Sequence, residues 1–144
     1  MFSKACEYGI KAAIYIAANS NEGKRVSLKG IAKHIDSPEA FTAKILQILA
    51  REKVITSVRG INGGFEIEKH NLEYIQLAHI VKAIDGDTIY KGCGIGLKEC
   101  NEAHPCPIHN DFKNVRNNLK TLLETTNLKS LAIDVNSGVS FLRI

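Results

Sequence analysis

Apolar residues recur at helical spacing along most of the chain and alternate only briefly near its middle. The first helical pattern covers residues 3–19, where Cys6 and Ile10 fall on one face before a polar run ends the segment. A second segment begins after Ser27, a residue type that often caps a helix N-terminus, and carries a buried stripe that includes Ile31. The spacing therefore predicts two successive helices at the start of the chain.

A third helix is predicted over residues 39–52, directly after a turn at Pro38, because proline is tolerated in the first turn of a helix. Its predicted apolar face consists of Phe41, Ile45, Ile48 and Leu49. Its polar side chains are expected off that face, namely Thr42, Lys44, Gln47 and Arg51. Two short helices joined by a tight turn, the second with polar side chains outward, are typical of a helix-turn-helix.

A short β-hairpin is predicted to follow. Residues 54–58 and 65–67 are rich in β-branched and aromatic side chains, and a glycine-rich turn that begins at Arg59 separates them. Glycine at such a tip lets the backbone approach another surface closely. A hairpin directly after a helix-turn-helix is the wing of a winged helix.

The second half of the chain alternates helices with a cysteine-bearing loop. Helices are predicted over 72–84 and 110–125, with a loop over 90–109 between them and a short helical turn near 128–132. The helix over 110–125 is long and one-sided for so small a domain, which favours a dimerisation helix; packing in the core is the alternative.

The predicted fold class is therefore mainly α with a small β-wing. A winged helix-turn-helix domain is expected over residues 1–86 and a cysteine cluster loop over 87–109. Residues 110–144 are expected to form the dimerisation helix and a C-terminal tail.

The charge of the chain is uneven. Residues 1–70 carry 11 Lys and Arg against 7 Asp and Glu, whereas residues 71–144 carry 8 of each. A basic patch is the electrostatic footprint of a nucleic-acid binder, although a modest imbalance on a solvated surface is the alternative. No apolar run approaches the roughly 20 residues of a membrane span. The amphipathic N-terminus, interrupted by Glu7 and Lys11, does not fit a signal peptide, so we expect a cytoplasmic protein with no membrane partner.

Three of the four cysteines lie in one short loop. Cys93, Cys100 and Cys106 are followed by His109, three positions beyond the last cysteine. Thiolates and an imidazole gathered in a cytoplasmic loop indicate a metal or iron–sulfur site. Zinc is the alternative, although zinc sites favour cysteine pairs two to four residues apart. Free cysteines that react with oxidants are a further alternative.

A small redox or electron-transfer protein is the competing function from another class. The chain has no CxxC pair, no phosphate-binding glycine loop and no nucleophile with a nearby base in sequence. We therefore expect no catalytic residues and no enzyme.

Four motifs in order carry a resemblance to a known family. These are residues 41–55, the run SVRGINGGF over 57–65, residues 75–86, and the three cysteines that end in CPIH at 106–109. Together they resemble the Rrf2 family of winged-helix transcription regulators, and within it the IscR-like and NsrR-like iron–sulfur members. The resemblance implies a homodimer, a double-stranded DNA operator, and an iron–sulfur cluster whose state controls DNA binding.

The family's DNA contacts, carried onto this chain, fall on the third helix and the wing. Lys44 is expected to reach a guanine edge or a phosphate, and Arg59 to enter the minor groove. Phe41 is expected either to touch a thymine methyl or to pack inward. The full set of expected contacts is Ser37, Pro38, Ala40, Phe41, Lys44, Ser57, Arg59 and Gly60. In place of the family's usual Pro-Gly, the wing carries Ile61 and Asn62.

The family's cluster ligands, carried over in the same way, are Cys93, Cys100, Cys106 and His109. A histidine as fourth ligand implies a two-iron, two-sulfur cluster. Glu7, at the position of an acidic ligand in NsrR-like members, is the alternative fourth ligand and implies a four-iron, four-sulfur cluster. Cys6 and His104 are further candidates. Six residues separate Cys93 from Cys100, one more than in IscR-like members.

Overall fold

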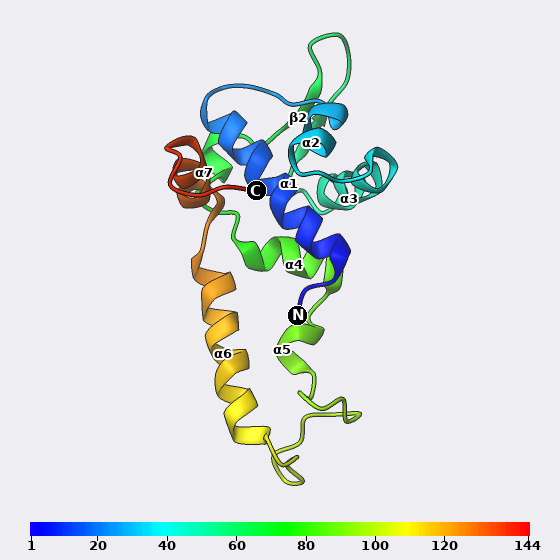
Figure 1. Ribbon diagram of the computed structural model, residues 1–144, viewed down its shortest axis with the longest axis vertical. Coiled ribbons are helices and arrows are strands. Elements are labelled where there is room, and N and C mark those ends of the chain that lie inside the picture. Colours follow the sequence, from blue (N-terminus) through cyan, green and yellow to red (C-terminus); the bar gives the residue numbers. More distant parts are fainter.

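The computed structural model describes all residues from 1 to 144 and consists mostly of helices, with a two-stranded wing at one end (Figure 1). The N-terminal half contains α1 (Lys4–Asn21), α2 (Leu28–His34), α3 (Glu39–Arg51), β1 (Thr56–Val58) and β2 (Gly64–Glu66). The other half contains the short 3-10 helix η1 (Lys69–Asn71), α4 (Leu77–Asp85), α5 (Thr88–Lys91), α6 (His109–Thr125) and α7 (Leu128–Asn136). The prediction of a mainly helical fold with a β-wing is confirmed.

Side-chain caps define the starts of the first two helices. The hydroxyl of Ser3 accepts a hydrogen bond from the backbone N–H of Cys6, and that of Ser27 accepts one from Gly30. These caps satisfy backbone donors that have no partner inside the helix. The predicted cap at Ser27 is confirmed.

The main core forms around α1, which lies in the middle of the N-terminal half (Figure 1). Ile16 of α1 packs in one cluster with Ile31 of α2 and Leu46 of α3, and all three are fully buried. Burial of each such side chain contributes roughly 1.5–3 kcal/mol. The core therefore holds the helix-turn-helix against α1.

The predicted inner face of α3 is partly wrong. Thr42, expected off the apolar face, is only 1% exposed. Its hydroxyl donates to the carbonyl of Pro38 at 2.8 Å and lies 2.9 Å from the Ser37 hydroxyl. A buried hydroxyl is tolerated here because these partners satisfy it. Ile48, expected on that face, is only partly buried, and Leu46 takes the deeper position.

The predicted helix over 72–84 begins five residues too early. Residues before Leu77 pair with the segment after α6 instead: the Leu77 N–H donates to the carbonyl of Thr126, and the Leu128 N–H donates to that of Ile75. These backbone bonds compete with helix formation and come from a segment about fifty positions away. Local periodicity therefore carries no trace of them.

The C-terminal part returns to the N-terminal half. Leu128 and Ala132 of α7 belong to the core cluster around α1, and the Asn136 side chain donates to the carbonyl of Ala18 at 3.1 Å. Helix α7 runs to Asn136, four residues beyond the predicted turn. Helix α6, by contrast, projects away from the core and carries the cysteine loop at its far end (Figure 1). No helix is both long and apolar enough to cross a membrane.

Candidate nucleic-acid interface and cysteine site

The N-terminal part of α3 presents an exposed surface that carries one cation, Lys44. Pro38, Ala40 and Lys44 are exposed. Phe41 is partly buried, and its ring packs edge-on against Tyr8 of α1, with centroids 5.7 Å apart and planes at 84°. Of the two expectations for Phe41, this geometry favours inward packing. The exposed residues are available to a ligand in front of α3.

The cation of the wing, Arg59, is exposed to solvent. Ser57, Arg59 and Gly60 are exposed. Neither Arg59 nor Lys44 takes part in any ion pair of the structure. Pairing of Arg59 with a neighbouring carboxylate, the ordinary role of a surface arginine, is therefore absent. Both cations are available to an external anion.

A residue that sequence reasoning missed holds the wing in place. The guanidinium of Arg25 donates to the Glu66 carboxylate at 2.9 Å and to the carbonyl of Asn62 at 3.2 Å. Backbone bonds in both directions between Val26 and Phe65 tie the same segment to β2. A basic residue just before a predicted helix, and an acid inside a predicted strand, were the available signals. Nothing in the sequence indicates that they meet.

The cysteine loop begins after α5 and ends at the first residue of α6. Its three cysteines are free and partly buried, whereas His109 is 7% exposed. The Cys100 sulfur lies 3.4 Å from Nδ1 of His109, and Cys106 is near enough to Cys93 to contribute to the lowering of its pKa. The four side chains thus form two pairs, and no three of them are gathered as a metal-binding group.

The backbone of the loop favours the thiolate of Cys93. N–H groups of Ile95 and Leu97 point at its sulfur and lower the pKa of Cys93, with a smaller contribution from Cys106. Hydrogen bonds to the charged form of a group stabilise that form. Thiolate is the state in which cysteine binds metals and reacts with oxidants.

The other candidate ligands lie in different surroundings. Glu7 is exposed and forms an ion pair with Lys4 at 3.1 Å. Cys6 is fully buried, as its spacing with Ile10 predicted, and burial, with the nearby Asp85 carboxylate, raises its pKa to about 12. A protonated, buried thiol is a poor ligand. His104 is exposed within the loop and pairs with neither cysteine pair.

By residue type the donor set suits a thiolate-liganded metal centre, although no three of its members are gathered in this structure. A sulfur and a nitrogen bound to one tetrahedral zinc ion lie about 3.5 Å apart, given bonds of about 2.3 and 2.0 Å. The 3.4 Å separation of Cys100 and His109 matches that spacing. Three thiols with one imidazole suit both iron–sulfur and zinc chemistry.

Comparison with known sequences gives one family for nearly the whole chain. Residues 2–134 match the family Rrf2, described as an iron-dependent transcriptional regulator. A protein of Aquifex aeolicus named as an HTH-type transcriptional regulator is 27% identical over 133 residues, which cover 91% of this chain and 90% of that protein. An rrf2-like HTH-type regulator of Rhodobacter capsulatus is 23% identical and covers 99% of both chains.

Solved structures share the fold. CymR of B. subtilis, described as the global cysteine regulator, superposes with a TM-score of 0.73 at 23% identity and covers 92% of this chain and 96% of its own. IscR of T. potens superposes with a TM-score of 0.72 at 20% identity and covers 97% of this chain and 91% of its own. At these identities the likeness establishes the architecture alone.

Proposed function

Because this chain belongs to the Rrf2 family of transcriptional regulators, we propose that an iron–sulfur cluster controls how it binds operator DNA. The observation that carries the proposal is the loop itself. It holds three cysteines and the nearly buried His109, and it is attached directly to the long helix α6. The cysteine loop and the N-terminal half, which carries α3 and the wing, are thus parts of one continuous structure.

In this proposal α3 is the recognition helix. Its exposed N-terminal part enters the major groove, where each base pair has a distinct pattern of donors and acceptors. Lys44 contacts a guanine edge or a phosphate, and Arg59 of the wing enters the adjacent minor groove. Their exposure and their lack of ion-pair partners support these roles. The remaining contacts are assigned to Ser37, Pro38, Ala40, Ser57 and Gly60, whereas Phe41 packs inward on Tyr8.

A second copy of the chain completes the regulator. Val115 and Leu122 of α6 are 55% and 54% exposed, and Ile108 just before the helix is 40% exposed. A row of exposed apolar side chains on a projecting helix favours burial against another protein surface. Pairing through α6 gives a symmetric dimer with two recognition helices, suited to half-sites about 34 Å apart.

Cys93, Cys100, Cys106 and His109 are the residues that hold the cluster. When bound, it supplies a centre that changes oxidation state, reacts with nitric oxide or is lost when iron is scarce. The loop residues bind the cluster, and α6, which begins at His109, moves with the loop. Regulation is then a shift between two arrangements of α6 and the recognition helices.

Two alternatives use the same loop. Zinc fits the same donors and would make the loop a structural element. A thiol switch without metal is supported by the contact between Cys93 and Cys106, which lies on the route to a disulfide. Glu7 of a second copy remains the alternative fourth ligand of a four-iron cluster.

Oxygen-free purification distinguishes these functions. We expect brown protein with visible absorbance, iron and acid-labile sulfide, and loss of all three in Cys106→Ala. Cys6→Ala is the matched control, because it removes a cysteine outside the loop, and it should retain the colour. Zinc without sulfide would favour the structural alternative. Colourless, metal-free protein that binds its operator normally would contradict the proposal.

A further inference from the structure

One face of the first two turns of α6 contacts the cysteine loop at four points. His109, Phe112, Lys113 and Arg116 follow the i, i+3, i+4, i+7 spacing that places side chains on one side of a helix. Each of these side chains contacts a different part of the loop. We call this set of four residues the α6 cradle.

The cradle contacts differ in chemistry, but all of them join α6 to the cysteine loop. His109 lies against Cys100, and Lys113 forms an ion pair with Glu102. Phe112 lies against Gly94, next to Cys93 in the sequence. The cradle therefore reaches the neighbourhood of both cysteine pairs.

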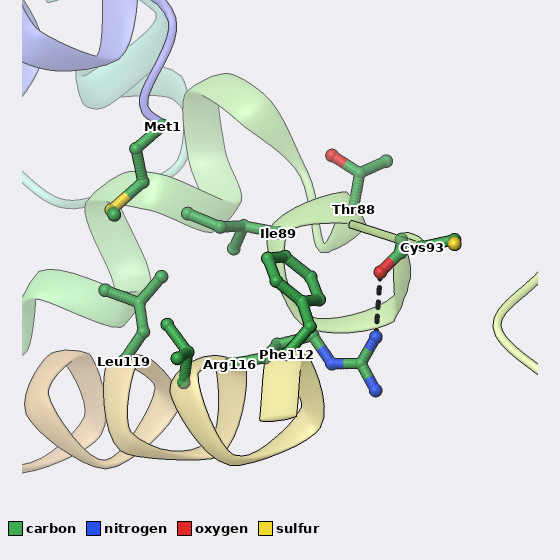
Figure 2. Close-up of a pocket in the computed structure, with 9 residues that line it drawn as sticks. Met1, Thr88, Ile89, Cys93, Phe112, Arg116 and Leu119 are labelled. Carbon is green, nitrogen blue, oxygen red and sulfur yellow. Dashed lines mark hydrogen bonds between the residues drawn. The ribbon is translucent and has the colours of Figure 1, made fainter. Parts of the chain in front are cut away.

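Arg116 makes the contact nearest to Cys93. Its NH1 donates to the carbonyl of Gly92 at 2.7 Å. That carbonyl belongs to the peptide group whose nitrogen is the Cys93 backbone nitrogen, so the bond fixes the peptide plane that precedes the thiol. Figure 2 shows the bond and shows the Cys93 sulfur pointing away from the apolar hollow between α5 and α6.

Phe112 holds the peptide on the other side of the same cysteine. A Cβ atom placed on Gly94 would lie 2.7 Å from the Phe112 ring, closer than real carbon contacts. Only glycine lets the loop backbone lie on this ring. Cys93 is therefore held from both sides, by a hydrogen bond at Gly92 and by an aromatic ring at Gly94.

We propose that Arg116 is a positioning residue that, with the rest of the α6 cradle, presets Cys93 for binding the metal centre. This inference depends on the proposed function. Preset ligands lose less conformational freedom on binding, which slows loss of the bound group. The same contacts make α6 the first helix to move when the ligation of Cys93 changes.

The test compares Arg116→Ala and Arg116→Lys with Lys120→Ala in the full-length protein. Lys120 is an exposed lysine one turn further along α6, so its removal controls for the loss of positive charge. Under air, Arg116→Ala should lose its visible absorbance roughly three- to tenfold faster than wild type, the range expected for one hydrogen bond. Arg116→Lys should recover part of the difference, and Lys120→Ala should match wild type.

A measurement without the cluster keeps this inference separate from the proposed function. Hydrogen exchange of the loop amides after Cys93 in apoprotein should accelerate in Arg116→Ala, while exchange in α1 stays unchanged. Gly94→Ala, which displaces the loop from Phe112, should have the same effect. Unchanged loop exchange and unchanged cluster loss in Arg116→Ala would overturn the inference, even in a protein that binds the cluster. Absence of a cluster in wild type would instead overturn the proposed function.

Discussion

At the scale of single residues, exposure separates side chains that are available to a ligand from those that support the fold. Lys44 and Arg59 extend from α3 and the wing into solvent without an ion-pair partner, whereas Phe41 packs on Tyr8. The sequence predicted the first two correctly as surface cations. The sequence did not decide between a DNA contact and inward packing for Phe41, because a residue at the edge of an apolar face can do either.

Lys44→Ala and Arg59→Ala should each weaken operator binding by about 1–3 kcal/mol. Lys44→Ala removes a groove or phosphate contact, and Arg59→Ala removes a minor-groove contact. Neither side chain supports the core. Lys82→Ala, an exposed cation on α4, should leave affinity unchanged. Fluorescence anisotropy over a range of salt concentrations measures both the affinity and the number of phosphate contacts. Wild-type affinity in both variants would exclude the assigned grooves.

Ser27→Ala should lower the free energy of unfolding by about 1 kcal/mol, because the Ser27 hydroxyl caps α2. Ser57→Ala, an exposed serine on the wing, should change it by less than about 0.5 kcal/mol. Urea denaturation followed by circular dichroism compares the two. Equal stabilities would mean that the cap contributes nothing to the helix-turn-helix.

At the scale of elements, the existence of each helix and of the wing could be predicted from periodicity and glycine. The start of α4 could not, because the residues before it pair with the segment after α6. The clamp of Arg25 on the wing, and the four contacts of the α6 cradle, also join residues far apart in sequence. Local patterns specify elements, and only the folded chain specifies which elements meet.

Gly64→Ala should destabilise the wing more than Gly60→Ala. Both glycines have positive φ, but a Cβ on Gly64 would lie 2.7 Å from the carbonyl oxygen of Val26, whereas Gly60 has open space around it. Strain of the backbone alone costs about 1–3 kcal/mol, and Gly64→Ala adds a clash with the strand partner. Hydrogen exchange at the amide of Phe65, which donates to Val26, reports the difference. Faster exchange in Gly60→Ala than in Gly64→Ala would refute this account of the wing.

At the scale of the whole molecule, two parts share one continuous helical scaffold. The N-terminal half surrounds α1, and α6 projects from it with the cysteine loop at the far end (Figure 1). The cysteine count and spacing predicted the loop correctly, but not that its side chains form two pairs. Such pairing depends on how α6 supports the loop, and spacing alone contains no information about that support.

Leu122→Asp should convert the proposed dimer into monomer, because it places a charge in the apolar row on α6. Ile133→Asp is the matched control, since Ile133 on α7 is 47% exposed and lies outside that row. Sedimentation velocity should give a monomer for the first variant and a dimer for the second. A dimer that survives Leu122→Asp would require an interface elsewhere.

The central claim is that the cluster held by the cysteine loop controls the affinity of α3 and the wing for operator DNA. The most direct measurement is operator affinity at fixed salt, in one oxygen-free preparation, before and after a chelator removes the cluster. We predict that affinity changes at least about tenfold, in step with the loss of visible absorbance, which corresponds to about 1.4 kcal/mol of coupling. Full loss of absorbance with unchanged affinity would contradict the claim.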